Sequence, residues 1–191
     1  SNTHDLLVFT NQCQVYKCKV AAFEDTKSAQ LGSYLPTDLE MGADEAVTWV
    51  IDPEDYKADV LFVFENGRVA RVALSGYATK TNRKRLKNAI YGGSKLVYAT
   101  VLKEERDLAL VSSDYRLVNF NTSLLKTKTT NSTQGVQALT IKGSRTVTMV
   151  GTAEEFIGGK AQVEKFRAEK LPSAGAPMKE TDMKSLFDLE E

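Results

Sequence analysis

Three stretches of the chain share one pattern of apolar and polar positions, and they are residues 6–16, 60–70 and 108–118. In each, an apolar run is followed by a polar turn and then by alternating apolar and polar residues. Alternation with a period of two is typical of a half-buried β-strand. The second turn contains Asn66-Gly67, a strong signal for a tight hairpin. The pattern therefore predicts three β-hairpins.

The hairpins belong to a longer repeat. One aliphatic position recurs in all three at offsets of 54 and 48 residues: Val15, Val69 and Leu117. A glycine turn in the second half of each copy leads into a further β-rich stretch, in which one position recurs at 50-residue spacing: Val47, Val97 and Val147. A period near fifty residues with about four strands per copy is typical of propeller-like blades. We therefore expect an all-β, propeller-like domain over residues 5–150, with units at about 5–55, 56–104 and 105–150.

The last forty residues break this pattern. Phe156, Ile157, Val163 and Phe166 suggest a short strand or an ordered strap, and the Pro and Gly residues of 171–177 suggest a turn or linker. Residues 182–191 are acidic, with apolar residues on one side. We expect residues 151–191 to form a closing strap and an acidic tail. A disordered tail and a tail docked on the blades are both open at this point.

Composition narrows the class of protein. The chain has 191 residues, of which 42% are hydrophobic and 26% charged, as in globular domains. No apolar run approaches the roughly 20 residues that a membrane helix needs. The first residues lack the basic and apolar regions of a secretory signal. These features predict a cytoplasmic protein without a membrane partner.

Charge is unevenly distributed, although 25 basic residues balance 25 acidic ones. Residues 1–55 hold 3 basic and 10 acidic side chains, residues 56–150 hold 16 and 6, and residues 151–191 hold 6 and 9. The middle of the chain therefore carries a net charge of +10 between two acidic ends. Such asymmetry indicates a nucleic acid or another acidic partner.

Residues 80–88 are the densest cationic segment, with five basic side chains: Lys80, Arg83, Lys84, Arg85 and Lys87. We expect a solvated loop on the rim, where cations gain by displacing the counterions of DNA phosphates. The other candidate contacts in the second and third units are Arg68, Arg71, Arg116, Lys126, Lys128, Lys142 and Arg145. The matching loop of the first unit, residues 24–30, has only Lys27. We therefore expect units two and three to bind duplex DNA, and unit one to face protein or solvent.

The rare residues argue against an enzyme. His4 is the only histidine, which excludes a Ser-His-Asp triad and a histidine-rich metal site. Cys13 and Cys18 lie five residues apart, which fits neither a redox motif nor a zinc site. The sequence also lacks a glycine-rich phosphate-binding loop. We therefore expect no catalytic residue, metal or cofactor on this chain.

Residues 7–20, 32–39 and 135–143 resemble the repeated segments of a known family, the C-terminal domains of the A subunits of bacterial DNA gyrase and topoisomerase IV. The last of them, beginning Gly135-Val136, is similar to the family's "G-V-x-x-I-x-L" segment. The resemblance implies a β-pinwheel, a propeller-like fold whose blades exchange strands, which bends or wraps duplex DNA on its rim. It also implies a nucleoid-associated protein whose partners are an ATPase subunit together with the N-terminal cleavage core of its own polypeptide. ATP and Mg²⁺ would be used on those other domains.

Two features depart from the family pattern. The sequence shows about three blades, whereas a complete gyrase domain usually has six. It also lacks a glutamine-arginine-arginine-glycine box, which shifts the expectation from introducing negative supercoils toward relaxation or decatenation. A propeller that binds protein without touching DNA is the alternative, supported by the acidic first unit and the zero net charge.

Overall fold

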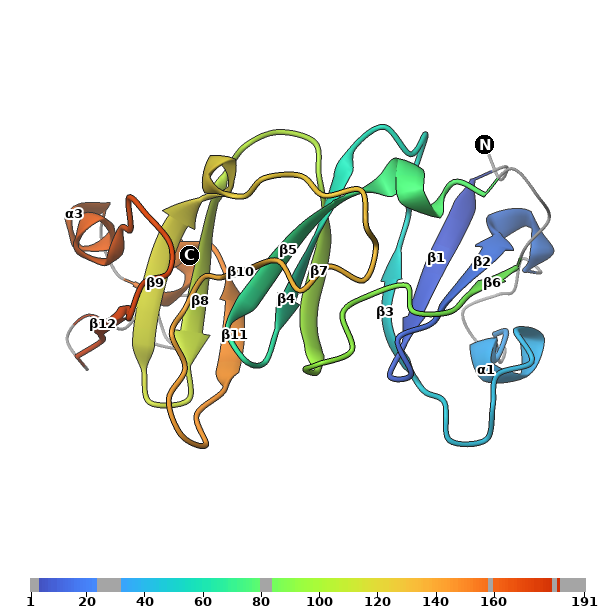
Figure 1. The fold of residues 1–191 in the computed structure, drawn as a ribbon, viewed down its shortest axis with the longest axis horizontal. Helices are drawn as coiled ribbons and strands as arrows, with labels where there is room; N and C mark the ends of the chain where they lie inside the picture. Colours follow the sequence, from blue (N-terminus) through green and yellow to red (C-terminus); the bar gives the residue numbers. More distant parts are fainter. Residues whose placement is uncertain (1–3, 24–31, 80–83, 158–159, 180–181, 183–191) are drawn as a thin grey trace.

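The computed structural model describes residues 4–23, 32–79, 84–157, 160–179 and 182. Three four-stranded antiparallel sheets, which we call blades 1, 2 and 3, lie side by side in chain order (Figure 1). The prediction of an all-β, propeller-like fold with about three four-stranded blades is confirmed. Short helices connect the strands or cover blade 3.

Each blade has four strands, ordered from its inner to its outer edge. Blade 1 contains β3 (Val47–Ile51), β1 (Asp5–Thr10), β2 (Val15–Lys19) and β6 (Arg85–Leu86). Blade 2 contains β7 (Leu96–Leu102), β4 (Asp59–Phe64), β5 (Arg68–Ala73) and β10 (Val136–Gln137). Blade 3 contains β11 (Val147–Gly151), β8 (Asp107–Ser112), β9 (Arg116–Asn121) and β12 (Ala176–Pro177).

The outermost strand of every blade comes from the next part of the chain. β6 belongs to the second repeat but pairs with β2 of blade 1, and β10 belongs to the third repeat but pairs with β5 of blade 2. β12 closes blade 3 by pairing with β9. Residues 171–177, expected to be only a turn or linker, therefore contain a strand. A unit of sequence and a blade of structure are thus offset by one strand.

The pairing register explains the aliphatic repeat. Val15, Val69 and Leu117 each pair on one side with the opening strand of their hairpin. On the other side they pair with the crossing strand, at these partners: Leu86, Val136 and Ala176. Each residue thus lies in the middle of its sheet, and all three are buried. One aliphatic position per repeat therefore fixes where the crossing strand pairs.

The second repeated position is corrected by one residue. Val47, Leu96 and Val147 pair with the ends of the opening strands, and each is followed by an irregularity in the register. The residue equivalent to Val47 and Val147 is therefore Leu96, and Val97 occupies the irregular position. In blades 1 and 3 that position is a threonine whose Oγ1 donates to a carbonyl of the neighbouring strand, at Thr48 and Thr148.

The core lies mainly between the blades. Phe9 of blade 1, Phe62 of blade 2 and Tyr77 pack edge to face, with ring centroids 5.2–6.4 Å apart. Between blades 2 and 3, a second cluster contains Leu61, Val63, Leu110, Val118 and Phe120. Because successive strand residues point to opposite faces, β4 supplies side chains to both clusters.

Helices cover the free face of blade 3. α2 (Ala153–Phe156), α3 (Lys160–Val163) and η4 (Glu164–Phe166) place Ile157, Val163 and Phe166 against Val111. The strap suggested by these apolar residues is thus helical, and the expectation of a strand there is wrong. A capping box at Thr152 and Glu155 starts α2. Residues 183–191 of the expected acidic tail lie outside the described residues.

The remaining helical turns are η1 (Val20–Ala22), α1 (Leu35–Asp38), η2 (Leu74–Tyr77) and η3 (Thr122–Leu124). Within the described ranges, no helix is long and apolar enough to cross a membrane.

Candidate nucleic-acid interface

The basic segment of the second repeat lies on the outer edge of blade 1. Lys84 accepts a backbone hydrogen bond from Lys17 at 2.7 Å, and Arg85 pairs with Tyr16 in the sheet. The side chains of Lys84, Arg85 and Lys87 are exposed. The expected free rim loop is therefore partly an edge strand. Lys80 and Arg83, the other two cations of this segment, lie outside the described residues.

This position corrects the expectation that unit one is not part of a basic surface. Sequence unit one is acidic, but blade 1 receives the cations of unit two through β6. Strand exchange thus moves positive charge one blade toward the N-terminus.

A buried carboxylate supports the edge at Arg85. The Arg85 guanidinium lies over the Tyr16 ring, 6.0 Å from its centroid, and the Tyr16 hydroxyl donates to Glu45 at 2.8 Å. Glu45 also accepts from Thr10 Oγ1 at 2.6 Å. Burial opposes ionisation of Glu45, but these two hydrogen bonds and that from the Gly42 amide hold its pKa below the ordinary value. The negative charge therefore stays under the outer edge and stabilises Arg85 there.

Lys126 and Lys128 lie on the outer edge of blade 2. The backbone of Lys128 donates to the Arg71 carbonyl and accepts from the Ala73 amide, both at 2.9 Å. Both lysine side chains are exposed, and neither forms an ion pair with a described residue. The backbone of this segment is therefore fixed while its charges face solvent.

Lys142 and Arg145 lie in the loop between β10 and β11. Both are exposed, and Arg145 forms an ion pair with Asp114 at 3.2 Å. An exposed pair of this kind is worth little and can exchange its partner for a phosphate. Both residues remain candidates for contacts with DNA.

Arg68 and Arg116 bind the crossing strands. Arg116 donates to the carbonyls of Ala174 and Gly175 at 2.8 and 2.6 Å. Arg68, at the equivalent place in blade 2, donates to the carbonyl of Gly135 at 3.4 Å. The expectation that these arginines are free rim cations is corrected, because β10 and β12 lie beside them and use their donors.

Arg71 is also enclosed, with 17% of its side chain exposed. Its guanidinium pairs with Asp59 at 2.6 Å and with Glu105 at 2.7 Å. Two carboxylates offset its single charge, so the expected phosphate contact is corrected to a structural one.

Sequence reasoning missed a repeated aspartate. Asp5, Asp59 and Asp107 each begin the opening strand of a blade, and their offsets of 54 and 48 are those of Val15, Val69 and Leu117. In blade 3, Asp107 accepts from Arg167 at 2.9 Å. In blade 2, Asp59 accepts from Thr127 at 2.6 Å. These two partners lie on the segments that cross to the outer edge, so the aspartate holds the incoming chain. The identical offsets were the signal that could have found it.

In blade 1 the equivalent aspartate has local partners. Asp5 pairs with Lys17 at 3.1 Å and Lys19 at 2.8 Å, and accepts from the Tyr56 hydroxyl at 2.8 Å. Burial opposes its ionisation, but the hydrogen bonds from Lys19 and Tyr56 hold its pKa below the ordinary value. Lys17 and Lys19 are therefore partly neutralised by Asp5.

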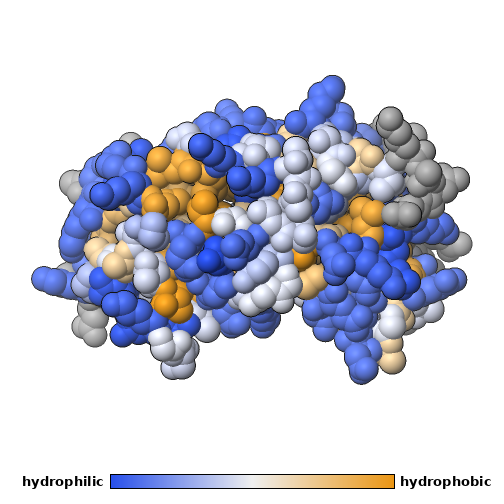
Figure 2. All heavy atoms as spheres, in the orientation of Figure 1, coloured by the Kyte–Doolittle hydropathy of each residue, from blue (hydrophilic) through white to orange (hydrophobic). Residues whose placement is uncertain are grey.

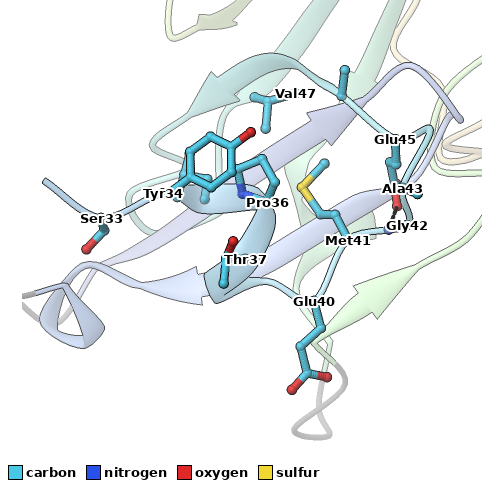
Figure 3. A pocket seen from close by; sticks show the side chains of 12 residues that line it. Ser33, Tyr34, Pro36, Thr37, Glu40, Met41, Gly42, Ala43, Glu45 and Val47 are labelled. Atoms are coloured by element: carbon cyan, nitrogen blue, oxygen red, sulfur yellow. Dashed lines mark hydrogen bonds between the residues drawn. The ribbon is translucent and has the colours of Figure 1, made fainter.

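A hollow of about 710 Å³ lies in blade 1, between α1 and the turn that leads into β3 (Figure 3). Its lining is mainly apolar and includes Tyr34, Met41 and Val47. Tyr34 is 70% exposed. Residues 28–56 contain seven carboxylates and no lysine or arginine. This part of blade 1 therefore differs in charge from the outer edge.

The exposed large apolar side chains of the described residues are spread over all three blades. They are Tyr34, Val50, Tyr115, Leu124, Val136 and Met149. Figure 2 shows mainly hydrophilic residues on the face seen in Figure 1, with apolar atoms at separate places. In the part of the chain that the structure describes, no group of three or more His, Cys, Asp or Glu side chains could hold a metal ion.

Comparison with known proteins places this geometry. No family model matches the chain. It is 24% identical over 115 residues to the A subunit of DNA gyrase from Treponema pallidum, covering 59% of this chain and 14% of that protein. It is 23% identical over 158 residues to the A subunit of DNA topoisomerase 4 from Staphylococcus aureus, covering 81% of this chain and 20% of that protein. The chain thus spans about a fifth or less of the length of these curated relatives.

Solved structures show the same fold. The C-terminal domain of DNA topoisomerase IV superposes with a TM-score of 0.69 at 22% identity, over 82% of this chain and 50% of that one. The C-terminal domain of E. coli ParC gives a TM-score of 0.73 at 12% identity, over 95% and 79%. The expected resemblance is therefore confirmed: in sequence and structure this chain is similar to the C-terminal domains of the A subunits of gyrase and topoisomerase IV, and it has their β-pinwheel fold.

Proposed function

We propose that this domain binds duplex DNA without sequence preference along the outer edges of its blades. It would serve as the non-catalytic DNA-bending or wrapping domain in the A subunit of a type IIA topoisomerase. The observation that carries the proposal is the exposure of cations on the crossing segments. These are Lys84, Arg85 and Lys87 on blade 1, and Lys126 and Lys128 on blade 2. Lys142 and Arg145 extend the set toward blade 3.

The chemistry of these side chains suits phosphate rather than bases. Lysine and arginine neutralise phosphates and release counterions, which gives affinity without reading sequence. Bending follows if one duplex contacts several blade edges at once, because the edges belong to separate sheets. In the parent protein, the partners would be the cleavage core of the same polypeptide and the ATPase subunit, where ATP and Mg²⁺ act.

The test is a salt titration of binding to a short duplex, followed by fluorescence anisotropy. With four to six phosphate contacts, the slope of log K against log salt concentration is expected at about −4 to −5, from about 0.9 per contact. Replacing Lys84, Arg85 and Lys87 together by glutamine should weaken binding to every duplex sequence and flatten the slope by up to about 2.7. Absence of binding at about 50 mM salt would refute the proposal.

A matched control is available on the same molecule. Lys57 and Lys103 are exposed but pair with acidic neighbours, Asp55 and Glu54, at 2.6 Å. Glutamine at both positions removes two charges away from the outer edges. This variant should keep nearly the wild-type slope.

A second candidate function is contact with another protein through blade 1. The hollow near Tyr34 and the acidic surroundings favour it. A partner here would offer an apolar side chain flanked by basic residues. The same DNA titration separates the two functions, since a protein-binding module would show no salt-dependent binding of the duplex.

A further inference from the structure

The segment that carries Lys126 and Lys128, residues 122–128, is held against blade 2 by one enclosed arginine. We infer that Arg71 is a positioning residue for this segment, which we call the lysine arm, and that it sets the grip of blade 2 on DNA phosphates. The inference rests on the proposed function and adds to it a residue that does not itself touch DNA.

Arg71 reaches the arm directly. From β5, its Nη1 atom donates to the carbonyl oxygens of Thr122 and Leu125, each at 3.4 Å. The same nitrogen pairs with Glu105 at 2.7 Å, and the other oxygen of Glu105 accepts from Thr122 Oγ1 at 2.7 Å. Glu105 thus joins the first turn of the arm to the guanidinium.

Asp59 holds the other end of the arm. Its Oδ2 atom accepts from Arg71 Nε and from Thr127 Oγ1, both at 2.6 Å. Thr127 stands between the two lysines, so fixing it on one side directs its neighbours to the other. The backbone of Lys128 is also hydrogen bonded to β5. The arm is therefore fastened at Thr122, Leu125, Thr127 and Lys128.

The arrangement separates charge from position. The charge of Arg71 is offset by Asp59 and Glu105, so Arg71 adds little to the positive potential of the edge. Lys126 and Lys128 carry the exposed charge, and their order depends on the backbone beneath them. A planar fork that binds two carboxylates and two carbonyls is a task that lysine cannot perform in the place of arginine.

Blade 3 supports this assignment through an equivalent contact. There Asp107 accepts from Arg167, and the next residue, Ala168, donates its amide to the Asn119 carbonyl at 2.7 Å. Lys128 makes the same amide contact with Arg71 in blade 2. An aspartate at the start of the opening strand thus holds the crossing chain in both blades, but in blade 2 the held segment carries two exposed lysines.

The experiment uses the full chain and a duplex of random sequence, long enough to reach several blade edges, in a salt titration. Lys126→Gln with Lys128→Gln measures the contribution of the arm itself, and the slope should fall by about 1.8. Thr127→Val removes the contact with Asp59 but leaves both lysines. We expect it to lower the affinity about threefold to tenfold at low salt and to reduce the slope by part of that amount. Thr127→Ser should restore both.

Arg71→Lys keeps the charge and removes the fork, and it should resemble Thr127→Val in the titration. Combined with the double lysine replacement, neither variant should weaken binding further, because the charges they position are already gone. Thermal unfolding confirms that each variant is folded. Hydrogen exchange at the Lys128 amide should accelerate in Thr127→Val and not in Thr127→Ser.

The outcomes separate two failures. If the double lysine variant keeps the wild-type slope, the arm does not touch DNA, and the proposed interface on blade 2 is refuted. If that variant loses slope while folded Arg71→Lys and Thr127→Val keep wild-type binding, the interface stands and the positioning role of Arg71 is refuted. If Thr127→Ser fails to rescue, the hydroxyl contact is not what holds the arm.

Discussion

Arg116 and Gly175 are joined by a hydrogen bond of 2.6 Å from the guanidinium Nη2 to the glycine carbonyl. The two residues are 59 positions apart, and the bond fastens β12 to the edge of blade 3. Arg68 and Gly135 form the equivalent contact in blade 2. Each of these crossing strands has only two residues, so its attachment depends on contacts beyond the backbone ladder.

Replacing Arg116 by glutamine should destabilise blade 3. Two hydrogen bonds from a charged donor are lost, each typically worth about 1.5–3 kcal/mol in isolation, and part of this is recovered by hydration. We expect a loss of about 1–3 kcal/mol in the free energy of unfolding, measured by urea denaturation. The slope of DNA binding against salt should change little. A large fall in slope with unchanged stability would instead make Arg116 a phosphate contact.

The third residue of each hairpin turn has a left-handed backbone: Cys13 at φ 57°, Gly67 at φ 81° and Tyr115 at φ 57°. At Gly67 a Cβ atom would also clash with the Leu139 carbonyl oxygen. Gly67→Ala should therefore cost more than the roughly 1–2 kcal/mol of left-handed strain, because β10 must also move. Tyr115→Gly should leave stability unchanged or raise it by about 0.5 kcal/mol. Thermal unfolding of the two variants checks the contrast.

Acid should weaken blade 1 through Glu45. Its folded pKa lies below the ordinary value, so its ionised form stabilises the native state at neutral pH. This contribution is fully present above the unfolded pKa of about 4.3 and is lost as the pH falls through the lower folded pKa. Glu45→Gln should be less stable than wild type at pH 7 by about 1–2 kcal/mol, and the difference should shrink toward pH 3. Urea midpoints at both pH values measure it.

The exposed Glu40, on the same loop, provides the control for this experiment. Glu40→Gln should show the wild-type dependence of stability on pH. If Glu45→Gln and Glu40→Gln behave alike, the network of Thr10, Tyr16 and Glu45 does not stabilise the blade.

The hairpins, the glycine turns and the three-blade fold could be predicted from sequence because each depends on local periodicity. The outer strands could not, since a pair of residues such as Arg85-Leu86 is too short to show alternation. The helices α2 and α3 could not be told from a strand, because a few apolar side chains fit a strand and a short helix equally well. Strand exchange also explains the errors in the site. Arg68 and Arg116 look solvent-facing along their own strands, but the crossing strand from the next part of the chain covers them.

The transfer of charge to blade 1 gives a direct test of where DNA lies. A photoactivatable crosslinker attached to cysteine in Lys87→Cys, with Cys13 and Cys18 replaced by serine, would report contacts at the outer edge of blade 1. Lys87 is exposed beside β6, whereas Thr37 is exposed on α1 near the acidic hollow. DNA should crosslink to the probe at position 87 and not to the same probe in Thr37→Cys. Salt should suppress the reaction, because phosphate contacts weaken as counterions compete. Equal crosslinking at both positions would mean that the duplex does not follow the basic edge, and crosslinking only at position 37 would place it beside the acidic hollow instead.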